Sequence, residues 1–155
     1  MNYLSQQNPN IFSGKRVIVR VDFNVPLEDG IVSDSEAFRI HTVIPTIQFL
    51  KSAGAKIVLL SHIGRSGDTL VPVADYLVKN FSELGITFSH DGTINGDCVL
   101  LENVRKTPGE ESNDSTYAQE LAGLGDYFVN DAFAVSHRAH ASIVGIAGLL
   151  PSYAG

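Results

Sequence analysis

The chain has 155 residues, a length that suits one domain with a hydrophobic core. Apolar residues make up 44% and charged residues 18%, the balance of a globular protein rather than of a disordered or membrane-spanning one. The net charge of −6 argues against nucleic acid as a general partner.

The cysteine content and the first residues predict a cytoplasmic protein. Cys98 is the single cysteine, so an internal disulfide is excluded and a reducing compartment is favoured. A free cysteine of this kind usually serves as a small buried apolar side chain. The segment 1–10 lacks both the basic start and the apolar stretch of a signal peptide. We therefore expect a soluble chain.

The first third of the chain predicts a strand followed by a helix. Residues 16–23 are rich in β-branched side chains, which favours a strand. Ser33 and Glu36 have the spacing of a capping box, and a helical pattern runs from there to about Ala53. Pro45 interrupts this pattern, and we expect either a kink or the first residue of a second helix there.

The middle third repeats this order. Residues 56–62 are nearly all apolar, which is typical of a parallel strand covered on both faces. Pro72 is suited to the first turn of a helix that extends to about Ser82. Residues 86–90 then predict a short strand.

The last third adds two strands and two helical segments. Residues 99–103 and 126–131 predict the strands, and either Asn113 or Asp114 caps a short helix between them. The apolar tail, residues 141–150, is expected to be helical in part.

This alternation predicts the α/β class, with an open, mostly parallel sheet and helices on both faces. In such sheets, ligands bind beyond the carboxyl ends of the strands. Polar side chains follow four of the predicted strands at that edge, in residues 22–26, 61–65, 102–105 and 130–140. The sequence thus directs attention to one edge of the sheet.

Arginines are concentrated near this edge. Of the six arginines, all but Arg16 lie at or just after the end of an apolar segment. A guanidinium group grips phosphate and carboxylate with a planar fork of N–H groups, so the set predicts a small anionic ligand. A lone arginine is usually a surface charge, and Asp22 or Asn24 alone is explained as well by turn capping. Their repetition at one edge favours a binding site.

Other site chemistries are weakly represented. His137 and His140 lack the further clustered ligands that zinc requires, so we expect no metal site. Gly123–Gly125 precedes a strand, whereas a dinucleotide fingerprint must follow one and open a helix. No serine or cysteine stands beside a base in a recognisable nucleophile motif.

Five segments in order resemble phosphoglycerate kinases, and the resemblance covers about residues 15–155. The segments are RVDFNVP (20–26), the stretch ending in Arg39-Ile40, SHIGR (61–65), LLENVR (100–105) and NDAFAVSHRAHAS (130–142).

The resemblance implies a two-domain enzyme that moves a phosphoryl group reversibly between 1,3-bisphosphoglycerate and ADP, giving 3-phosphoglycerate and ATP. Residues 1–155 would be its Rossmann-like N-terminal domain, which holds the phosphoglycerate, truncated at the C-terminal end. Mg-ATP and Mg-ADP would be bound by an absent C-terminal domain, so we expect no cofactor, no nucleotide-binding residue and no activity on this chain alone. We expect 3-phosphoglycerate and 1,3-bisphosphoglycerate as partners, neither nucleic acid nor a membrane, and a monomeric full-length enzyme.

The resemblance also implies site residues by position. The implied substrate contacts are Asp22, Phe23, Asn24, Arg39, His62, Ile63, Gly64, Arg65, Arg105 and Arg138. Arg20 and His137 correspond to members of the family's basic patch, and Arg39 to the arginine that contacts the transferring phosphoryl group.

Two other functions are alternatives to a phosphoglycerate kinase. A stand-alone α/β domain would capture phosphorylated acids without catalysis. An unrelated doubly wound enzyme would use a dinucleotide, but no GxGxxG segment follows the first predicted strand.

Overall fold

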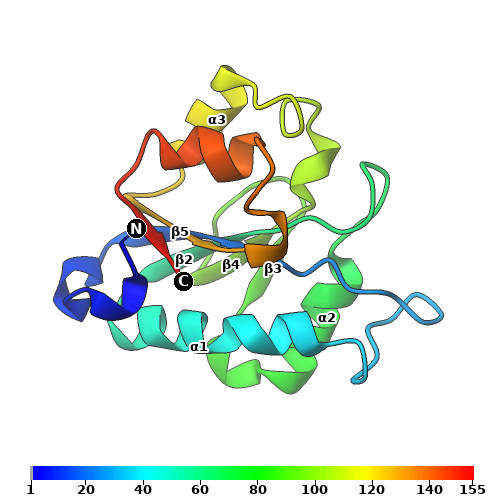
Figure 1. Cartoon of the computed structure of the whole chain (residues 1–155). Helices are drawn as coiled ribbons and strands as arrows, with labels where there is room; N and C mark the ends of the chain where they lie inside the picture. The colour runs from blue at the N-terminus through cyan, green and yellow to red at the C-terminus, as the bar shows by residue number, and fades with distance from the viewer. Residues whose placement is uncertain (1) are drawn as a thin grey trace.

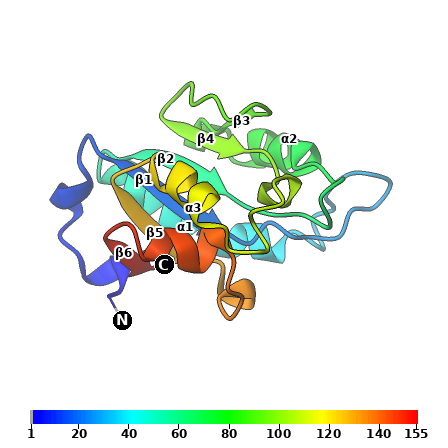
Figure 2. The ribbon, with the colours of Figure 1, turned by 90° about the horizontal axis from the view of Figure 1, so that it is seen from above.

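Apolar segments of the chain form one sheet, in which every strand pairing is parallel (Figures 1 and 2). The computed structural model describes residues 2–155. The strands are β1 (Arg16–Val21), β2 (Lys56–Leu60), β3 (Thr87–Ser89), β4 (Cys98–Leu101), β5 (Tyr127–Asp131) and β6 (Ser152–Ala154). Their order is β3-β4-β2-β1-β5-β6. The predicted α/β class is confirmed.

Helices cover both faces of this sheet. The helices are α1 (Phe38–Ser52), α2 (Val71–Asn80), α3 (Ser115–Ala122) and a π-helical segment, Ala141–Gly145. Short 3-10 turns lie at Leu4–Gln6, Pro9–Phe12, Ser82–Leu84, Val104–Lys106 and Phe133–Val135. Figure 1 shows α1 and α2 below the sheet, and α3 with the red C-terminal segment above it.

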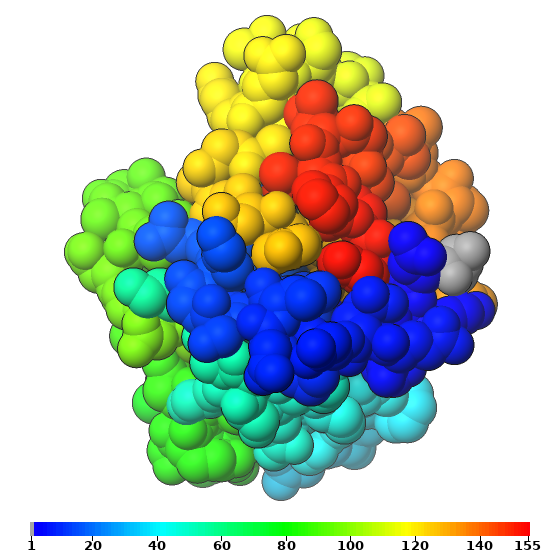
Figure 3. All heavy atoms as spheres, turned by 90° about the vertical axis from the view of Figure 1, so that its left-hand side faces the viewer, coloured from blue at the N-terminus to red at the C-terminus, as the bar shows by residue number. Residues whose placement is uncertain are grey.

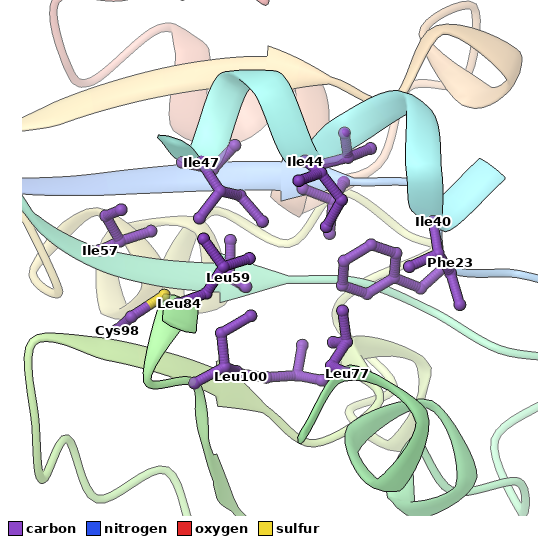
Figure 4. Close-up of a cluster of buried hydrophobic side chains, with 14 of the residues drawn as sticks. Phe23, Ile40, Ile44, Ile47, Ile57, Leu59, Leu77, Leu84, Cys98 and Leu100 are labelled. Atoms are coloured by element: carbon purple, nitrogen blue, oxygen red, sulfur yellow. The ribbon is translucent and has the colours of Figure 1, made fainter. Parts of the chain in front are cut away.

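The core follows from this two-sided cover. Ile40, Ile44 and Ile47 recur at helical spacing on one face of α1, and all three are buried. They face the β2 side chains Ile57 and Leu59 across the lower layer (Figure 4). A second buried cluster lies above the sheet and joins the strands to α3 and the C-terminal segment. Strands covered on both faces are expected to be apolar throughout, as β1 and β2 largely are.

The register of β1 places its end beside the ends of its neighbours. Arg20 pairs with Leu60 of β2 and Asn130 of β5. The strand order reverses at β1, because β2 follows it on one side and β5 returns to the other. Such a reversal point is where ligands bind in open α/β sheets.

Local expectations fared unevenly. Pro45 lies inside one α-helix, so the alternative of a second helix starting there is wrong. The capping box is also wrong, because Ala37 is the N-cap of α1 and Ser33 Oγ lies 3.0 Å from Ser35 Oγ instead. Asp114, rather than Asn113, caps α3, with its Oδ1 accepting a hydrogen bond from the Tyr117 amide at 2.9 Å.

The two ends of the chain meet at the β6 edge. Strand β6 was not expected, because Ser152–Ala154 is a short segment without alternating apolar residues. The Ala154 amide donates to the Asn2 carbonyl at 2.8 Å. Figure 3 shows the blue N-terminal segment running beside the red C-terminal segment. Within residues 2–155, no helix combines the length and apolar character needed to span a membrane.

A glycine before β5 provides a test of this packing. A Cβ atom at Gly125 would lie 2.8 Å from Ile18 Cγ1 and 2.9 Å from the Arg16 carbonyl oxygen. We expect Gly125→Ala to lower the free energy of unfolding by about 1–3 kcal/mol, measured by urea denaturation. The control Gly123→Ala meets nothing closer than 3.4 Å and should be neutral or stabilising by up to about 1 kcal/mol. Equal effects of the two substitutions would contradict this packing.

Candidate functional site at the carboxyl edge of the sheet

The loops after β1, β2 and β5 leave the sheet at one edge, because these strands are parallel and in register. The blue loop after β1 projects from that edge, on the right of Figures 1 and 2. Most of the predicted site residues belong to these loops, and hydrogen bonds join several of them.

An ion pair joins the end of β1 to the first turn of α1. Arg39 Nη1 donates to Asp22 Oδ2 at 2.8 Å. The Asp22 side chain is 9% exposed and that of Arg39 is 46% exposed. Asp22 Oδ1 also accepts from the Asn24 amide at 3.2 Å. A guanidinium has five N–H groups, so the pair leaves Arg39 with donors directed to solvent.

Gly64 connects two of the other predicted residues. Its amide donates to Asn24 Oδ1 at 2.9 Å, and its carbonyl accepts from Arg105 Nη1 at 2.6 Å. Gly64 has φ +49°, and a Cβ atom there would lie 2.1 Å from Asp68 Oδ2. The positive φ favours glycine at this position, and any side chain here would also displace the Asp68 carboxylate.

A buried amide fixes the loop after β2. Asn103 Nδ2 lies 2.8, 2.9 and 3.0 Å from the carbonyls of Ile63, Arg65 and Asp68. The amide carries two hydrogens, so these three acceptors share them. Asn103 Oδ1 accepts from the Arg105 amide at 3.1 Å. One side chain therefore holds the backbone of two site loops.

A cleft of about 900 Å³ lies beside these loops. It is lined by Asn24, Val25, Pro26, Leu27, Gly30, Ser35, Glu36, Phe38, Arg39, Ile63, Gly64, Gly67, Asp68, Thr69 and Pro72. Of the predicted site residues, Asn24, Arg39, Ile63 and Gly64 are in this lining. The lining combines polar residues such as Asn24 and Arg39 with apolar ones such as Val25 and Ile63, which suits a small polar ligand.

Arg20, which the resemblance assigned to the family's basic patch, is buried. Only 1% of the surface of Arg20 is exposed. Its Nε donates to Ser142 Oγ at 2.8 Å, its Nη1 to the Val21 carbonyl, and its Nη2 lies 3.0 Å from His62 Nδ1. Burial lowers the pKa of Arg20 to about 10, against the opposing effect of the Glu110 charge. It remains charged at neutral pH and acts from inside the protein.

Glu110 supplies the negative charge that Arg20 requires. Its carboxylate is fully buried and accepts from Ser142 through both oxygens, from Oγ at 2.6 Å and from the amide at 3.0 Å. His140 Nδ1 lies 3.7 Å from the same carboxylate. The buried arginine thus has a counter-charge within this chain.

His62 is neutral in this setting. Burial lowers its pKa to about 3, and the positive charge of Arg20 adds to the effect. The charges of Arg105, Arg138 and His140 lower it further. These groups are therefore close enough to His62 to influence its titration, as a common edge requires.

The remaining predicted residues divide by burial. Phe23 and Ile63 are buried in the core, so their side chains serve packing and their backbones alone face the site loops. Arg65, His137 and Arg138 are exposed. The convergence of guanidinium groups stays a prediction, since Arg138 is exposed like Arg65 and His137, and Arg105 is fixed by the Gly64 carbonyl rather than by His62.

Four residues of the site region had no assigned role in the sequence. They are Glu102, Asn103, Glu110 and Ser142. Each contacts residues distant in sequence, which a local pattern does not reveal; Glu102, for example, accepts from the Thr69 hydroxyl and the Leu70 amide. Within residues 2–155, no three His, Cys, Asp or Glu side chains lie together in a group that could hold a metal ion.

Comparison with known proteins gives one family. The model of the family "Phosphoglycerate kinase" matches residues 8–155. The curated phosphoglycerate kinase of Borreliella afzelii is 48% identical, over 94% of this chain and 41% of its own length. That of Maricaulis maris is 46% identical, over 92% of this chain and 39% of its own length. The chain spans about two fifths of these relatives.

Solved structures agree. Phosphoglycerate kinase from Coxiella burnetii has a TM-score of 0.84 and 34% identity, covering 98% of this chain and 40% of that one. The enzyme from Pyrococcus horikoshii has a TM-score of 0.82 and 31% identity, covering 100% of this chain and 42% of that one.

The role of Asn103 is testable by truncation. We expect Asn103→Ala to lower the free energy of unfolding by about 1–3 kcal/mol, because it leaves buried carbonyls without donors. Urea denaturation measures this change. The control Asn80→Ala removes one exposed amide contact to the Tyr76 carbonyl and should change stability by less than about 0.5 kcal/mol. Similar losses in both variants would refute the role.

The buried neutral state of His62 predicts an acid dependence of stability. Its folded-state pKa of about 3 lies below the ordinary 6.5, so the unfolded chain binds a proton first as pH falls. This contribution is complete above about pH 6.5 and is lost as the pH falls toward about 3. We expect His62→Gln, which does not titrate, to flatten stability over this range. Chemical unfolding at a series of pH values measures it, and an unchanged slope would contradict the assignment.

Proposed function

Since the chain belongs to the phosphoglycerate kinase family, we propose that it supplies the phosphoglycerate-binding part of such an enzyme. The reaction would be reversible phosphoryl transfer between 1,3-bisphosphoglycerate and ADP, giving 3-phosphoglycerate and ATP. Residues 1–155 would act as the N-terminal domain, and 3-phosphoglycerate and 1,3-bisphosphoglycerate would be its ligands.

The placing of arginines at the carboxyl edge carries this proposal, because Arg39 donates to Asp22 after β1 and Arg105 to the Gly64 carbonyl after β2. Arg105 and Arg138 act electrostatically on one buried imidazole, and Arg39 extends from α1 at the same edge. A phosphorylated acid has two anionic ends, which such a set of guanidinium groups can bind at separate points. Asn24 and Asp22 provide polar groups for a hydroxyl that lies between the two anionic ends of the ligand.

Arg39 is proposed as the catalytic residue. The phosphoryl acceptor in this reaction is a carboxylate that is already ionised at neutral pH, so no general base is required. Catalysis then depends on positioning and on stabilising negative charge in the transition state. Arg39 suits this role because Asp22 fixes its orientation with one ion pair and leaves other N–H donors free for the transferring group.

The nucleotide is proposed to bind outside residues 1–155. Mg-ATP and Mg-ADP are the nucleotide substrates that the family reaction requires. The acidic groups of residues 2–155 do not form a cluster suited to a metal ion, which fits a nucleotide site elsewhere in the enzyme. A monomeric, cytoplasmic enzyme completes the proposal, and the buried thiol of Cys98 fits a reducing compartment.

Calorimetric titration of this chain tests the ligand. We expect weak binding of 3-phosphoglycerate and none of Mg-ATP. Arg39→Ala should weaken 3-phosphoglycerate binding about tenfold, the effect of losing one hydrogen bond between charged groups. Arg16→Ala removes the same charge at the start of β1, the opposite end of the strand, and should leave binding unchanged. No binding of 3-phosphoglycerate, or equal losses in both variants, would overturn the proposal.

A further inference from the structure

The buried groups behind His62 form a continuous chain of hydrogen bonds, which runs from the Glu110 carboxylate to the neutral imidazole of His62. Glu110 accepts from Ser142, Ser142 Oγ accepts from Arg20 Nε, and Arg20 Nη2 meets His62 Nδ1. The residues Glu110, Ser142, Arg20 and His62 are each at most 2% exposed. We call these four residues the buried relay.

The direction of each bond in the relay is fixed by chemistry. An arginine can only donate, so His62 Nδ1 must accept and cannot carry a proton. The neutral imidazole therefore holds its proton on Nε2. At the other end, an ionised carboxylate can only accept, so the Ser142 hydroxyl donates to Glu110 and keeps a lone pair for Arg20.

The second nitrogen of His62 is left available. Among residues 2–155, no hydrogen bond is made to Nε2, although every other member of the relay is bound on both sides. A neutral N–H donor beside several guanidinium groups has a clear advantage for an anionic ligand. It donates a hydrogen bond without adding another positive charge to a site where such charges repel.

We infer that Glu110 is a positioning residue of this site, which acts through Ser142 and Arg20 to hold His62 as a neutral Nε2–H donor toward a bound anion. The identity of that anion as phosphoglycerate rests on the proposed function. Without the Glu110 charge, Arg20 would lose the larger of its two counter-charges and keep only that of Asp22, and it would turn toward water or the ligand. His62 would then lose the donor that fixes its tautomer.

Ring nitrogen NMR of His62 in the ¹⁵N-labelled chain tests this inference without ligand. Signals are assigned by their loss in His62→Gln. We expect the wild-type ring to show unprotonated Nδ1 and protonated Nε2 from about pH 5 to 8. In Glu110→Gln, we expect averaged nitrogen shifts from a mixture of tautomers and charged form. The control Glu120→Gln removes an exposed charge from α3, above the same face of the sheet, and should leave the signals unchanged.

A second variant protects the test against misfolding. Ser142→Ala breaks the relay but keeps both buried charges, and it should also produce averaged His62 signals. A wild-type ring protonated on Nδ1 would overturn the inference. So would an unaltered Nε2–H tautomer in folded Glu110→Gln or folded Ser142→Ala.

Binding separates this inference from the proposed function. We expect Glu110→Gln to weaken 3-phosphoglycerate binding about tenfold, with Glu120→Gln unchanged. If the tautomer responds as expected but the wild-type chain does not bind 3-phosphoglycerate, the proposed function fails and the relay stands. If binding is normal in wild type and in Glu110→Gln, the relay has no role in binding and the inference fails.

Discussion

Two buried opposite charges, Arg20 and Glu110, are joined through the Ser142 hydroxyl, and they govern the arrangement of this site. Arg20 reaches from the end of β1 into the layer between the sheet and the C-terminal segment, and Glu110 meets it there through Ser142. A charged group is tolerated in such a place only when its donors are satisfied and an opposite charge is close. Three chain segments, around residues 20, 110 and 142, must therefore lie together for the sheet edge to form. Behind the arginines of the candidate site, the buried charge of Arg20 is thus compensated by that of Glu110.

Two amide side chains, Asn24 and Asn103, hold the loops in front of these charges together with charged side chains. Asn24 holds the Gly64 amide, and Asn103 holds the carbonyls of the same loop from behind. Amide side chains can donate and accept at once, which suits them to join backbone groups of opposite polarity. Charged groups share this task, since Asp22 accepts from the Asn24 amide, Asp68 accepts from the Arg65 amide, and Arg105 donates to the Gly64 carbonyl.

Several elements could be predicted from the sequence because their cause is local. The apolar run of β2 and the cap Asp114 depend on neighbours a few residues away. The rule for parallel sheets predicted which edge of the sheet would carry the candidate site. The positions of the arginines at the ends of apolar segments predicted that this edge would be rich in positive charge. The buried place of Arg20 could not be predicted, because its partner Ser142 is 122 residues away. The failed capping box at Ser33 shows the converse, since a local pattern was overridden by the loop that enters α1.

The burial of the predicted contacts constrains how the site can work. Asp22 and His62 are nearly buried, whereas Arg39, Arg65 and Arg138 are exposed on long side chains. Asp22 and His62 are held rigidly by hydrogen bonds, so these two side chains can define where a ligand sits without losing conformational freedom. The exposed arginines have freedom to lose, and a ligand must order them at a cost of about 0.5–1.5 kcal/mol each. The same geometry therefore predicts weak binding of the ligand and a strong dependence of that binding on the pre-ordered side chains of Asp22 and His62. A ligand gains most from the groups that the fold has already fixed, which is why the setting of His62 matters as much as the number of positive charges around it.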